Sequence, residues 1–405
     1  MAVGLSEPGE LLPVRGIRLA ATPAGIKKDG QPDMVLIDCV TDTQMAGVFT
    51  RNAFCAAPVV VAREHLESSR PRWLLINSGN ANAGTGQQGL DNARQTCTQV
   101  AGHFNAEATE VLPFSTGVIN EQLPIGKLLS GIDTLVDGLD VNGWSAAARG
   151  IMTTDTVAKA TSRSLTIGDC QINITGISKG SGMICPNMAT MLAYVATDAR
   201  VEREDLEALL IDANQDSFNS ISVDGDTSTN DACILIATGA ADNDPLNRSH
   251  PEWEAFSDAV RSVMQHLAQA IVRDGEGATK FIAIEVNGGR DRAECREVAY
   301  TVAHSPLVKT AFFASDPNLG RLLMAVGCAR IDSLDVAGVS VAIDDVPVIR
   351  HGEPHPGYTE EQGQTVMARE EITVHVDLGR GDASATVWTS DLSYEYVRIN
   401  AEYRS

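Results

Sequence analysis

The chain has 405 residues, of which 43% are hydrophobic and 21% are charged, which is typical of a globular protein with two or three structural units. Its formal net charge of −22 argues against a nucleic-acid or anionic-membrane partner, because both would repel it. No apolar run approaches the ~20 residues that span a bilayer, the N-terminal residues lack an export signal, and the eight cysteines form no Cys-x-x-Cys element. We therefore expect a cytoplasmic protein with reduced thiols.

Strand and helix patterns alternate along the chain and predict a mixed α and β protein. Residues 73–76 (WLLI) predict a buried strand, followed by a loop rich in glycine and asparagine and by a helix at residues 91–103. Gly168 and Asp169 separate two strand-like segments, residues 164–167 and 170–177, and are typical of a two-residue hairpin turn.

Two amphipathic helices are predicted in the second half of the chain. The first has apolar residues at helical spacing, namely Leu206, Leu209, Leu210 and Ala213. The second has Pro251 in its first turn and repeats Trp253, Phe256, Val260, Val263, Leu267 and Ile271. These stripes indicate helix faces that pack into the core. Residues 281–286 then predict a strand, and the last third alternates short strands with helices.

Residues 179–199, KGSGMICPNMATMLAYVATDA, begin as a loop, turn at a Pro-Asn pair and enter an apolar strand. Ala189 and Thr190 lie where the turn meets the strand, a place that can hold a strained peptide bond. A threonine hydroxyl is a poor nucleophile unless a base removes its proton. Cleavage before Thr190 would create an α-amine with a reference pKa of ~7.7–8.0, suited to act as that base. From these residues alone, a threonine that begins a core strand is the simpler interpretation.

This segment closely resembles the self-processing segment of the ornithine acetyltransferase family, in which the scissile bond precedes the threonine of MATML. The resemblance extends over essentially the full chain. Its further motifs, in the family's order, are NSGNANAGTG (77–86), STGVI (115–119), IMTTDT (151–156), VDGDTSTND (223–231), DGEGATKF (274–281), SPLVKTAFFASDPNLGR (305–321) and YVRINAEYRS (396–405).

The resemblance implies an α+β fold, the αββα sandwich of ornithine acetyltransferases and DmpA-like proteins. It also implies that the protein cuts itself into an α chain, residues 1–189, and a β chain, residues 190–405, which begins with the nucleophile. Two α and two β chains would form a heterotetramer.

The resemblance further assigns the site residues. Thr190 would be the nucleophile both for cleavage after Ala189 and for acetyl transfer. Thr116 and Gly117 would form the oxyanion hole, since a glycine N–H and a threonine hydroxyl can both donate to a developing oxyanion. The expected substrate contacts are Thr153, Lys179, Thr190, Glu276, Asn400 and Ser405. A lysine can pair with a carboxylate and a glutamate with an amine, as amino acid substrates require.

Some of these positions look unremarkable in the sequence. Lys179 and Glu276, each next to small residues, resemble solvated loop charges, and a C-terminal stretch is usually frayed, whereas the implied function requires an ordered tail. Two positions depart from the family pattern. Ser405 replaces the threonine of many members and keeps the hydroxyl, and Asn120 stands where glycine is common, which puts the loop beyond the oxyanion hole in doubt.

The implied reaction is transfer of acetyl from N-acetylornithine to glutamate through acetyl-Thr190, giving ornithine and N-acetylglutamate in cyclic arginine biosynthesis. Acetyl-CoA is expected as a second donor substrate, and no cofactor is expected. The alternatives within this class are a monofunctional enzyme that does not use acetyl-CoA and a relative that acts on another acylated amino acid. A non-catalytic binding protein would keep the fold and tolerate Thr190→Ala without loss of its role.

An alternative from a different class is a nicotinamide-dependent oxidoreductase that uses GTGQQG, residues 84–89. Seven residues, 77–83, separate the predicted strand end from Gly84, whereas the dinucleotide fingerprint places its glycines directly after the strand. His351 and His355 have the spacing of zinc ligands on a helix, but the glycine and proline between them favour a surface turn. The acidic run 223–231 does not match a calcium loop, so no metal is expected.

Overall fold

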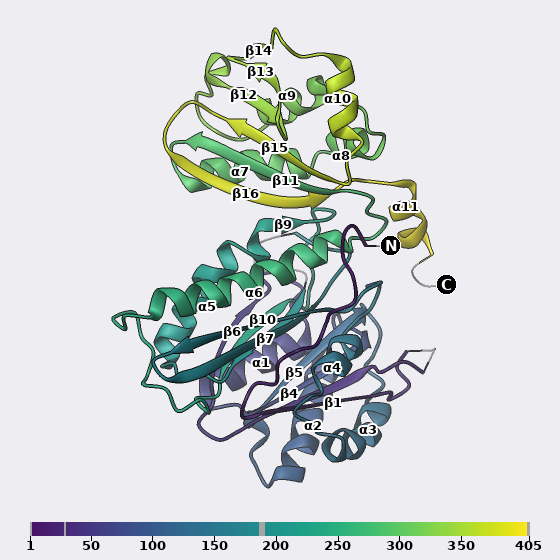
Figure 1. The fold of residues 1–405 in the computed structure, drawn as a ribbon. Helices are drawn as coiled ribbons and strands as arrows, with labels where there is room; N and C mark the ends of the chain where they lie inside the picture. The colour runs from purple at the N-terminus through teal and green to yellow at the C-terminus, as the bar shows by residue number, and fades with distance from the viewer. Residues whose placement is uncertain (1, 28–29, 186–190, 403–405) are drawn as a thin grey trace. The chain divides into compact units, whose positions relative to one another are not determined.

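The computed structural model describes residues 2–27, 30–185 and 191–402, and the chain divides into two compact units (Figure 1). The N-terminal unit consists of Glu7–Asn219 and Asp226–Ile271, and the C-terminal unit consists of Met1–Ser6, Ser220–Gly225 and Val272–Ser405. Each unit has a hydrophobic core of its own.

The N-terminal unit contains two β-sheets. The first has the order β1 (Ile17–Thr22), β2 (Met34–Cys39), β4 (Trp73–Asn80), β5 (Val111–Val118). The second has the order β3 (Gln44–Phe49), β10 (Ala232–Ala237), β8 (Leu192–Thr197), β7 (Cys170–Lys179), β6 (Lys159–Ile167). The pairs β4–β5 and β8–β10 are parallel and the other neighbours are antiparallel. Strands β8 and β10 are buried along their whole length, as expected for inner strands with both faces covered.

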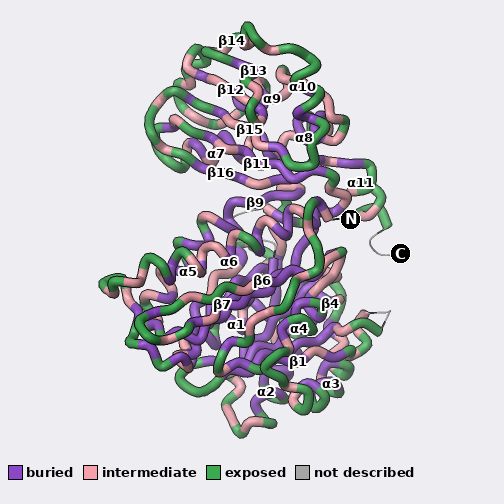
Figure 2. The backbone as a smooth tube through the Cα atoms, viewed as in Figure 1, coloured by how far each residue is buried: buried purple, intermediate pink, exposed green. Residues whose placement is uncertain are grey.

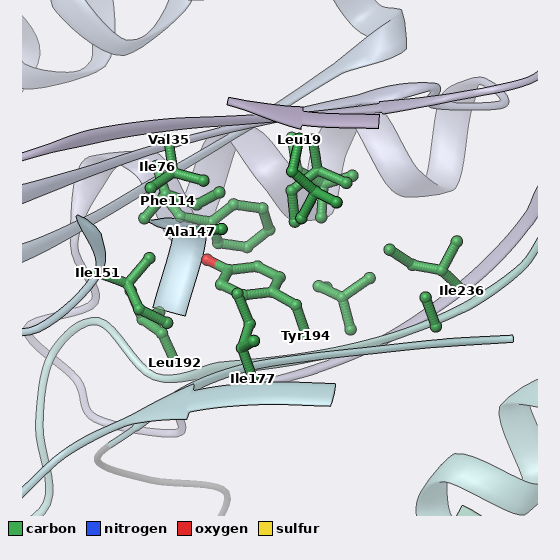
Figure 3. Packing of buried hydrophobic residues seen from close by; sticks show 14 of the residues in the cluster. Leu19, Val35, Ile76, Phe114, Ala147, Ile151, Ile177, Leu192, Tyr194 and Ile236 are labelled. Carbon is green, nitrogen blue, oxygen red and sulfur yellow. The ribbon is translucent and has the colours of Figure 1, made fainter. Parts of the chain in front are cut away.

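Apolar side chains from the two sheets fill the space between them. Figure 3 shows Val35, Ile76 and Phe114 of the first sheet facing Leu192 and Tyr194 of the second. The rings of Phe114 and Tyr194 meet edge to face with centroids 5.3 Å apart, a favourable geometry for aromatic pairs. Helix α4 (Trp144–Gly150) adds its buried residues to the same cluster.

Helices cover the outer faces of both sheets. On the first sheet, α2 (Gly86–Phe104) and α3 (Ile125–Asp137) pack against residues such as Trp73, and α1 (Ala57–Ser68) packs against β5 and α2. On the second sheet, α5 (Arg203–Gln215) contacts β3 and β10. Helix α6 (Trp253–Arg273) lies so close to β7 that a Cβ on Gly176 would be 2.8 Å from Leu267. In Figure 2 buried strands lie between helices whose outer faces are exposed. This order confirms the predicted αββα sandwich.

The C-terminal unit is built on one seven-stranded mixed sheet. Its order is β14 (Glu353–Pro354), β13 (Val346–Arg350), β12 (Ser340–Ile343), β15 (Glu371–Asp377), β11 (Phe281–Gly289), β16 (Ala383–Ser390), β9 (Ile221–Ser222). The helices of this unit are α7 (Arg292–Ala303), α8 (Pro306–Phe313), α9 (Leu319–Gly327), α10 (Glu360–Met367) and α11 (Tyr394–Ala401). Alternate residues of the strands pack with α7 to α10 in a single core. Short 3₁₀ helices in the chain are η1 (Ala108–Glu110), η2 (Phe218–Ser220) and η3 (Val336–Gly338).

The elements predicted from local patterns are confirmed, with one correction. The hairpin β6–β7 closes with Ile167 opposite Cys170, and α5, α6 and β11 lie at the predicted positions. The strand predicted at residues 73–76 is longer, because β4 continues to Asn80 through its pairing with β5. Its polar end is stabilised inside the protein, as shown by Ser78 Oγ, which donates to the carbonyl of Gly150 at 2.7 Å.

Candidate active site

Thr116 and Gly117 lie at the end of β5, where this strand passes very close to β4. Thr116 pairs with Ser78 and Gly117 pairs with Gly79, and the register shifts at the next residue of β4. Gly117 has φ = +133°, and a Cβ at this position would lie 2.3 Å from the carbonyl carbon of Gly79. Only glycine fits here, so the contact between the two backbones fixes the position of both predicted oxyanion-hole residues.

Lys179 is the last residue of β7 and is buried, in contrast to the solvated loop charge that its sequence neighbours suggest. Its backbone pairs with Leu192 at the start of β8. Its ammonium group donates to Thr116 Oγ1 at 3.2 Å. The structure therefore brings two of the predicted site residues, from the two sheets of the unit, into direct contact.

The side chain of Asp155 is fully buried in the loop that follows α4. Its Oδ1 accepts hydrogen bonds from the Gly180 N–H at 2.7 Å and from Lys159 Nζ at 2.6 Å. Its Oδ2 accepts from the N–H of Thr153, a predicted substrate contact, at 2.9 Å. Asp155 therefore ties the Thr153 loop to the backbone directly after Lys179.

The charges around Asp155 set its protonation state. Burial alone would raise the pKa of Asp155, but the ammonium groups of Lys159 and Lys179 and the Gly180 N–H outweigh burial and hold that pKa well below its usual value. The carboxylate is therefore ionised at neutral pH. Because Lys159 is fully buried as well, removal of either partner would leave an uncompensated charge away from water.

Glu276 and Asn400, predicted substrate contacts in the C-terminal unit, are hydrogen-bonded to each other. Asn400 Nδ2 donates to Glu276 Oε2 at 2.8 Å and to the Tyr396 carbonyl at 3.0 Å. Glu276 is buried, although its place between two glycines suggests an exposed loop. Asn400 lies on α11, so the C-terminal segment is helical as far as Ala401, and the last residues of the predicted tail, 403–405, lie outside the described residues.

The loop that carries Glu276 is anchored from the segment between β16 and α11. Asp391 accepts a hydrogen bond from the N–H of Thr279 at 2.8 Å. Ser393 donates to the Gly277 carbonyl at 2.6 Å and caps the N-terminus of α11. Gly277 has φ = +70° and packs directly against the α11 backbone. The loop that carries Glu276 is therefore fixed to α11 by hydrogen bonds and by this close backbone contact.

Ala189, Thr190 and Ser405 lie outside the described residues. The described chain resumes at Met191, whose carbonyl accepts a hydrogen bond from the N–H of Ala232 at 3.0 Å. It then enters β8, which is paired on both sides with β7 and β10. The chain directly after the predicted nucleophile is thus fixed in the interior of the second sheet.

A sequence model of the ArgJ family matches residues 18–405. The chain belongs to the ArgJ family. This ArgJ-family chain is 53% identical to proteins named "Arginine biosynthesis bifunctional protein ArgJ" from Pseudomonas fluorescens (strain Pf0-1) and Psychrobacter arcticus, over 100% of both chains in each comparison. The resemblance deduced from the motifs is therefore confirmed.

A solved structure is also similar, the crystal structure of the arginine biosynthesis bifunctional protein argJ from Bacillus halodurans. The two are 38% identical with a TM-score of 0.51, and the match covers 53% of this chain and 100% of the other. This likeness agrees with the α+β fold described above.

The prediction that seven residues separate the strand from the glycines of residues 84–89 is wrong. Strand β4 runs to Asn80, so only three residues precede Gly84, and β4, α2 and β5 form a parallel βαβ unit. The structure nevertheless gives Gly89 a different role. A Cβ on Gly89 would lie 1.9 Å from Thr85 Oγ1, which itself bonds to Asn82 Oδ1 at 2.9 Å. Gly89 is therefore required for the packing of the loop's own side chains, and the family match opposes the oxidoreductase interpretation.

The histidine pair at residues 351 and 355 does not lie on a helix. His351 lies in the turn between β13 and β14 with φ = +55°, so the HGEPH segment is a turn that leads into the short strand β14 and not a helix. Within the described ranges, no group of three or more His, Cys, Asp or Glu side chains could hold a metal ion. Across the same residues, no helix is both long enough and apolar enough to cross a bilayer.

Two residues that organise the site were not predicted. Asp155 lies within the IMTTDT motif, and an acidic residue in a run of small polar residues was the available signal. Asp391 follows the end of β16 and belongs to none of the quoted motifs, so its anchoring role is visible only in the folded chain.

Proposed function

We propose that this ArgJ-family chain is a self-processing ornithine acetyltransferase that also accepts acetyl-CoA. It transfers acetyl from N-acetylornithine to glutamate in arginine biosynthesis. The observation that carries the proposal is the 53% identity, over the full length, to proteins named as bifunctional in arginine biosynthesis. We place the enzyme in the cytoplasm. That no disulfide bond joins cysteines in the described part of the chain supports this assignment.

Maturation begins when the Thr190 hydroxyl attacks the carbonyl of Ala189 and converts the peptide bond into an ester. Water hydrolyses the ester and leaves a carboxylate on Ala189 and an α-amine on Thr190. The β chain would then hold 216 of the 405 residues. The Bacillus halodurans chain aligns in full with 53% of this chain, a share equal to that of the proposed β chain.

The strand order explains why the two products would stay together. Strand β7 of the α chain pairs with β8 of the β chain, and β3 of the α chain pairs with β10 of the β chain. Residues from both products also contribute to the core between the sheets. Separation would expose this core, so association is strongly favoured. The further assembly into a heterotetramer of two α and two β chains is proposed from the family resemblance.

In the mature enzyme, the α-amine of Thr190 takes the proton of its own hydroxyl, and the oxygen attacks the acetyl carbonyl of N-acetylornithine. The Thr116 hydroxyl and the Gly117 N–H donate to the oxyanion that forms. Ornithine leaves with the proton. The amine of glutamate then attacks the acetyl ester of Thr190, the bond between the acetyl carbon and the Thr190 oxygen breaks, and a proton from the glutamate amine restores the Thr190 hydroxyl as N-acetylglutamate leaves. The groups that would hold the amino acid substrates are Thr153, Lys179, Glu276, Asn400 and Ser405, of which Lys179 suits a carboxylate and Glu276 an amine.

A denaturing gel with intact mass spectrometry tests the proposal. The wild-type protein should give two polypeptides, residues 1–189 and 190–405, while Thr190→Ala should remain one chain and transfer nothing. Assays with N-acetylornithine and with acetyl-CoA, each with glutamate as acceptor, should both be positive and show ping-pong kinetics. A fully processed Thr190→Ala protein would place the nucleophile elsewhere.

The same experiments separate the alternatives. A monofunctional enzyme would be processed and active with N-acetylornithine but inactive with acetyl-CoA. A relative with another substrate would be processed and inactive with both donors. An oxidoreductase would remain one chain and bind a nicotinamide nucleotide.

A further inference from the structure

The contact between Lys179 and Thr116 has a consequence for the direction of the Thr116 hydroxyl. A charged ammonium group has three donors and no acceptor, whereas a threonine hydroxyl has one donor and two acceptor lone pairs. In the hydrogen bond of 3.2 Å between them, the oxygen of Thr116 must therefore be the acceptor. The single hydroxyl hydrogen of Thr116 is then directed away from Lys179 and remains able to donate to another group.

We propose that Lys179 is a positioning residue that orients and polarises the Thr116 hydroxyl as an oxyanion donor, and that Asp155 keeps Lys179 in place for this task. The inference rests on the proposed function and deepens it, because it gives Lys179 a role that is separate from contact with the substrate. A cation on the oxygen of a hydroxyl makes its hydrogen a stronger donor. A neutral lysine amine could instead accept the hydrogen of Thr116, and the donor would be lost.

Asp155 supports Lys179 in two ways. Its buried carboxylate provides a negative charge near the ammonium group, which burial alone would disfavour. The same carboxylate accepts from the N–H of Gly180 at 2.7 Å, and this bond fixes the backbone directly after Lys179. The interaction is mutual, since the charge of Lys179 contributes to the lowered pKa of Asp155. The Asp155 carboxylate therefore acts on the Lys179 ammonium group, and the ammonium group in turn acts on the Thr116 hydroxyl.

Self-cleavage provides a test that involves no bound substrate. If Lys179 only binds substrate, its replacement changes KM and leaves the cleavage rate unchanged. If Lys179 orients Thr116, its replacement slows cleavage and lowers kcat. The experiment follows cleavage over time after cell-free synthesis of the full chain, with Lys179→Met, Lys179→Arg, Thr116→Val and the double variant Lys179→Met/Thr116→Val. Lys127→Met is the matched control, because Lys127 is an exposed lysine of α3 in the same unit.

We expect Thr116→Val to slow cleavage by about 10²–10³-fold, the usual effect of removing one oxyanion donor. Lys179→Met should slow it at least tenfold, and the double variant should be no slower than Thr116→Val, because both changes remove the same donor. Lys179→Arg, which keeps a charged donor, should recover most of the rate. In mature enzyme, kcat should follow the same pattern.

Three results would overturn the inference: wild-type cleavage by Lys179→Met with only KM raised, full additivity in the double variant, or equal rates for Lys179→Arg and Lys179→Met. If Lys179→Met does not fold, Asp155→Asn replaces it in the cycle and must show the same non-additivity with Thr116→Val. These outcomes are distinct from failure of the proposed function, in which the wild-type and Lys127→Met proteins would themselves remain uncut.

Discussion

Replacement of Asp155 by alanine should destabilise the N-terminal unit more than any substitution of a surface charge. The variant loses a carboxylate that accepts three hydrogen bonds, from Lys159, Gly180 and Thr153. A hydrogen bond to a charged group contributes about 1.5–3 kcal/mol, and breaking a buried ion pair costs about 3–5 kcal/mol. Since the three bonds share one group and do not add, we expect a loss of about 3–5 kcal/mol in the free energy of unfolding.

The assay is urea unfolding followed by tryptophan fluorescence, because Trp73 and Trp144 are buried in the N-terminal unit. The control is Glu64→Ala, which removes the carboxylate of an exposed ion pair with Arg94 at 2.9 Å and should cost less than about 1 kcal/mol. Equal losses for Asp155→Ala and Glu64→Ala would refute the argument that burial makes the Asp155 interactions strong.

The pH dependence gives a second check on Asp155. Its pKa in the folded protein is lowered below the value in the unfolded chain, so the unfolded state binds its proton first as the pH falls. The stability that Asp155 contributes is therefore fully present above about pH 5 and is lost as the pH decreases below about 4. The difference between the wild type and Asp155→Ala should shrink over that interval, and a difference that grows toward acid pH would contradict the assigned sign.

Gly117→Ala should reduce the rate of acetyl transfer at least ~100-fold in a kinetic assay, because the added Cβ would lie 2.3 Å from the Gly79 carbonyl carbon. Activity near that of the wild type would contradict this steric argument. Burial lowers the pKa of Lys309 to about 8, so the unfolded state binds more protons than the folded state above that pH. The free energy of unfolding of the wild type should therefore rise by on the order of 3 kcal/mol relative to Lys309→Met as the pH increases from 8 to above 10. Urea-unfolding midpoints of the two proteins that change in parallel across this range would disprove the prediction. Tyr194→Phe should leave the thermal midpoint unchanged or raise it, because within the described part of the chain the buried Tyr194 hydroxyl has no hydrogen-bond partner; a decrease of several degrees would reveal a bound partner such as a water molecule.

The candidate site was only partly accessible from the sequence. The resemblance supplied Thr116, Lys179, Glu276 and Asn400 as separate positions, and the structure joins them into the hydrogen-bonded pairs Lys179–Thr116 and Asn400–Glu276. The sequence did not indicate that Lys179 and Glu276 are buried, because burial of a charge depends on partners that lie far away along the chain. The role of Asp155 was not predicted for the same reason.

The sequence by itself determined the features that depend on near neighbours. The glycine turn of the β6–β7 hairpin and the apolar faces of α5 and α6 follow from residues within a few positions of one another, so a local pattern is sufficient to predict them. The ordered set of motifs likewise identified the family, and with it the proposed nucleophile Thr190.

Only the tertiary structure decided where the chain must have one particular residue or one particular charge. Gly117 is required because β4 passes against it at Gly79, 38 positions earlier in the sequence. The chain also returns at residues 220–225 to contribute β9 to the C-terminal unit. Such contacts join segments that are distant in sequence, and their energies depend on the register and burial that the complete fold imposes.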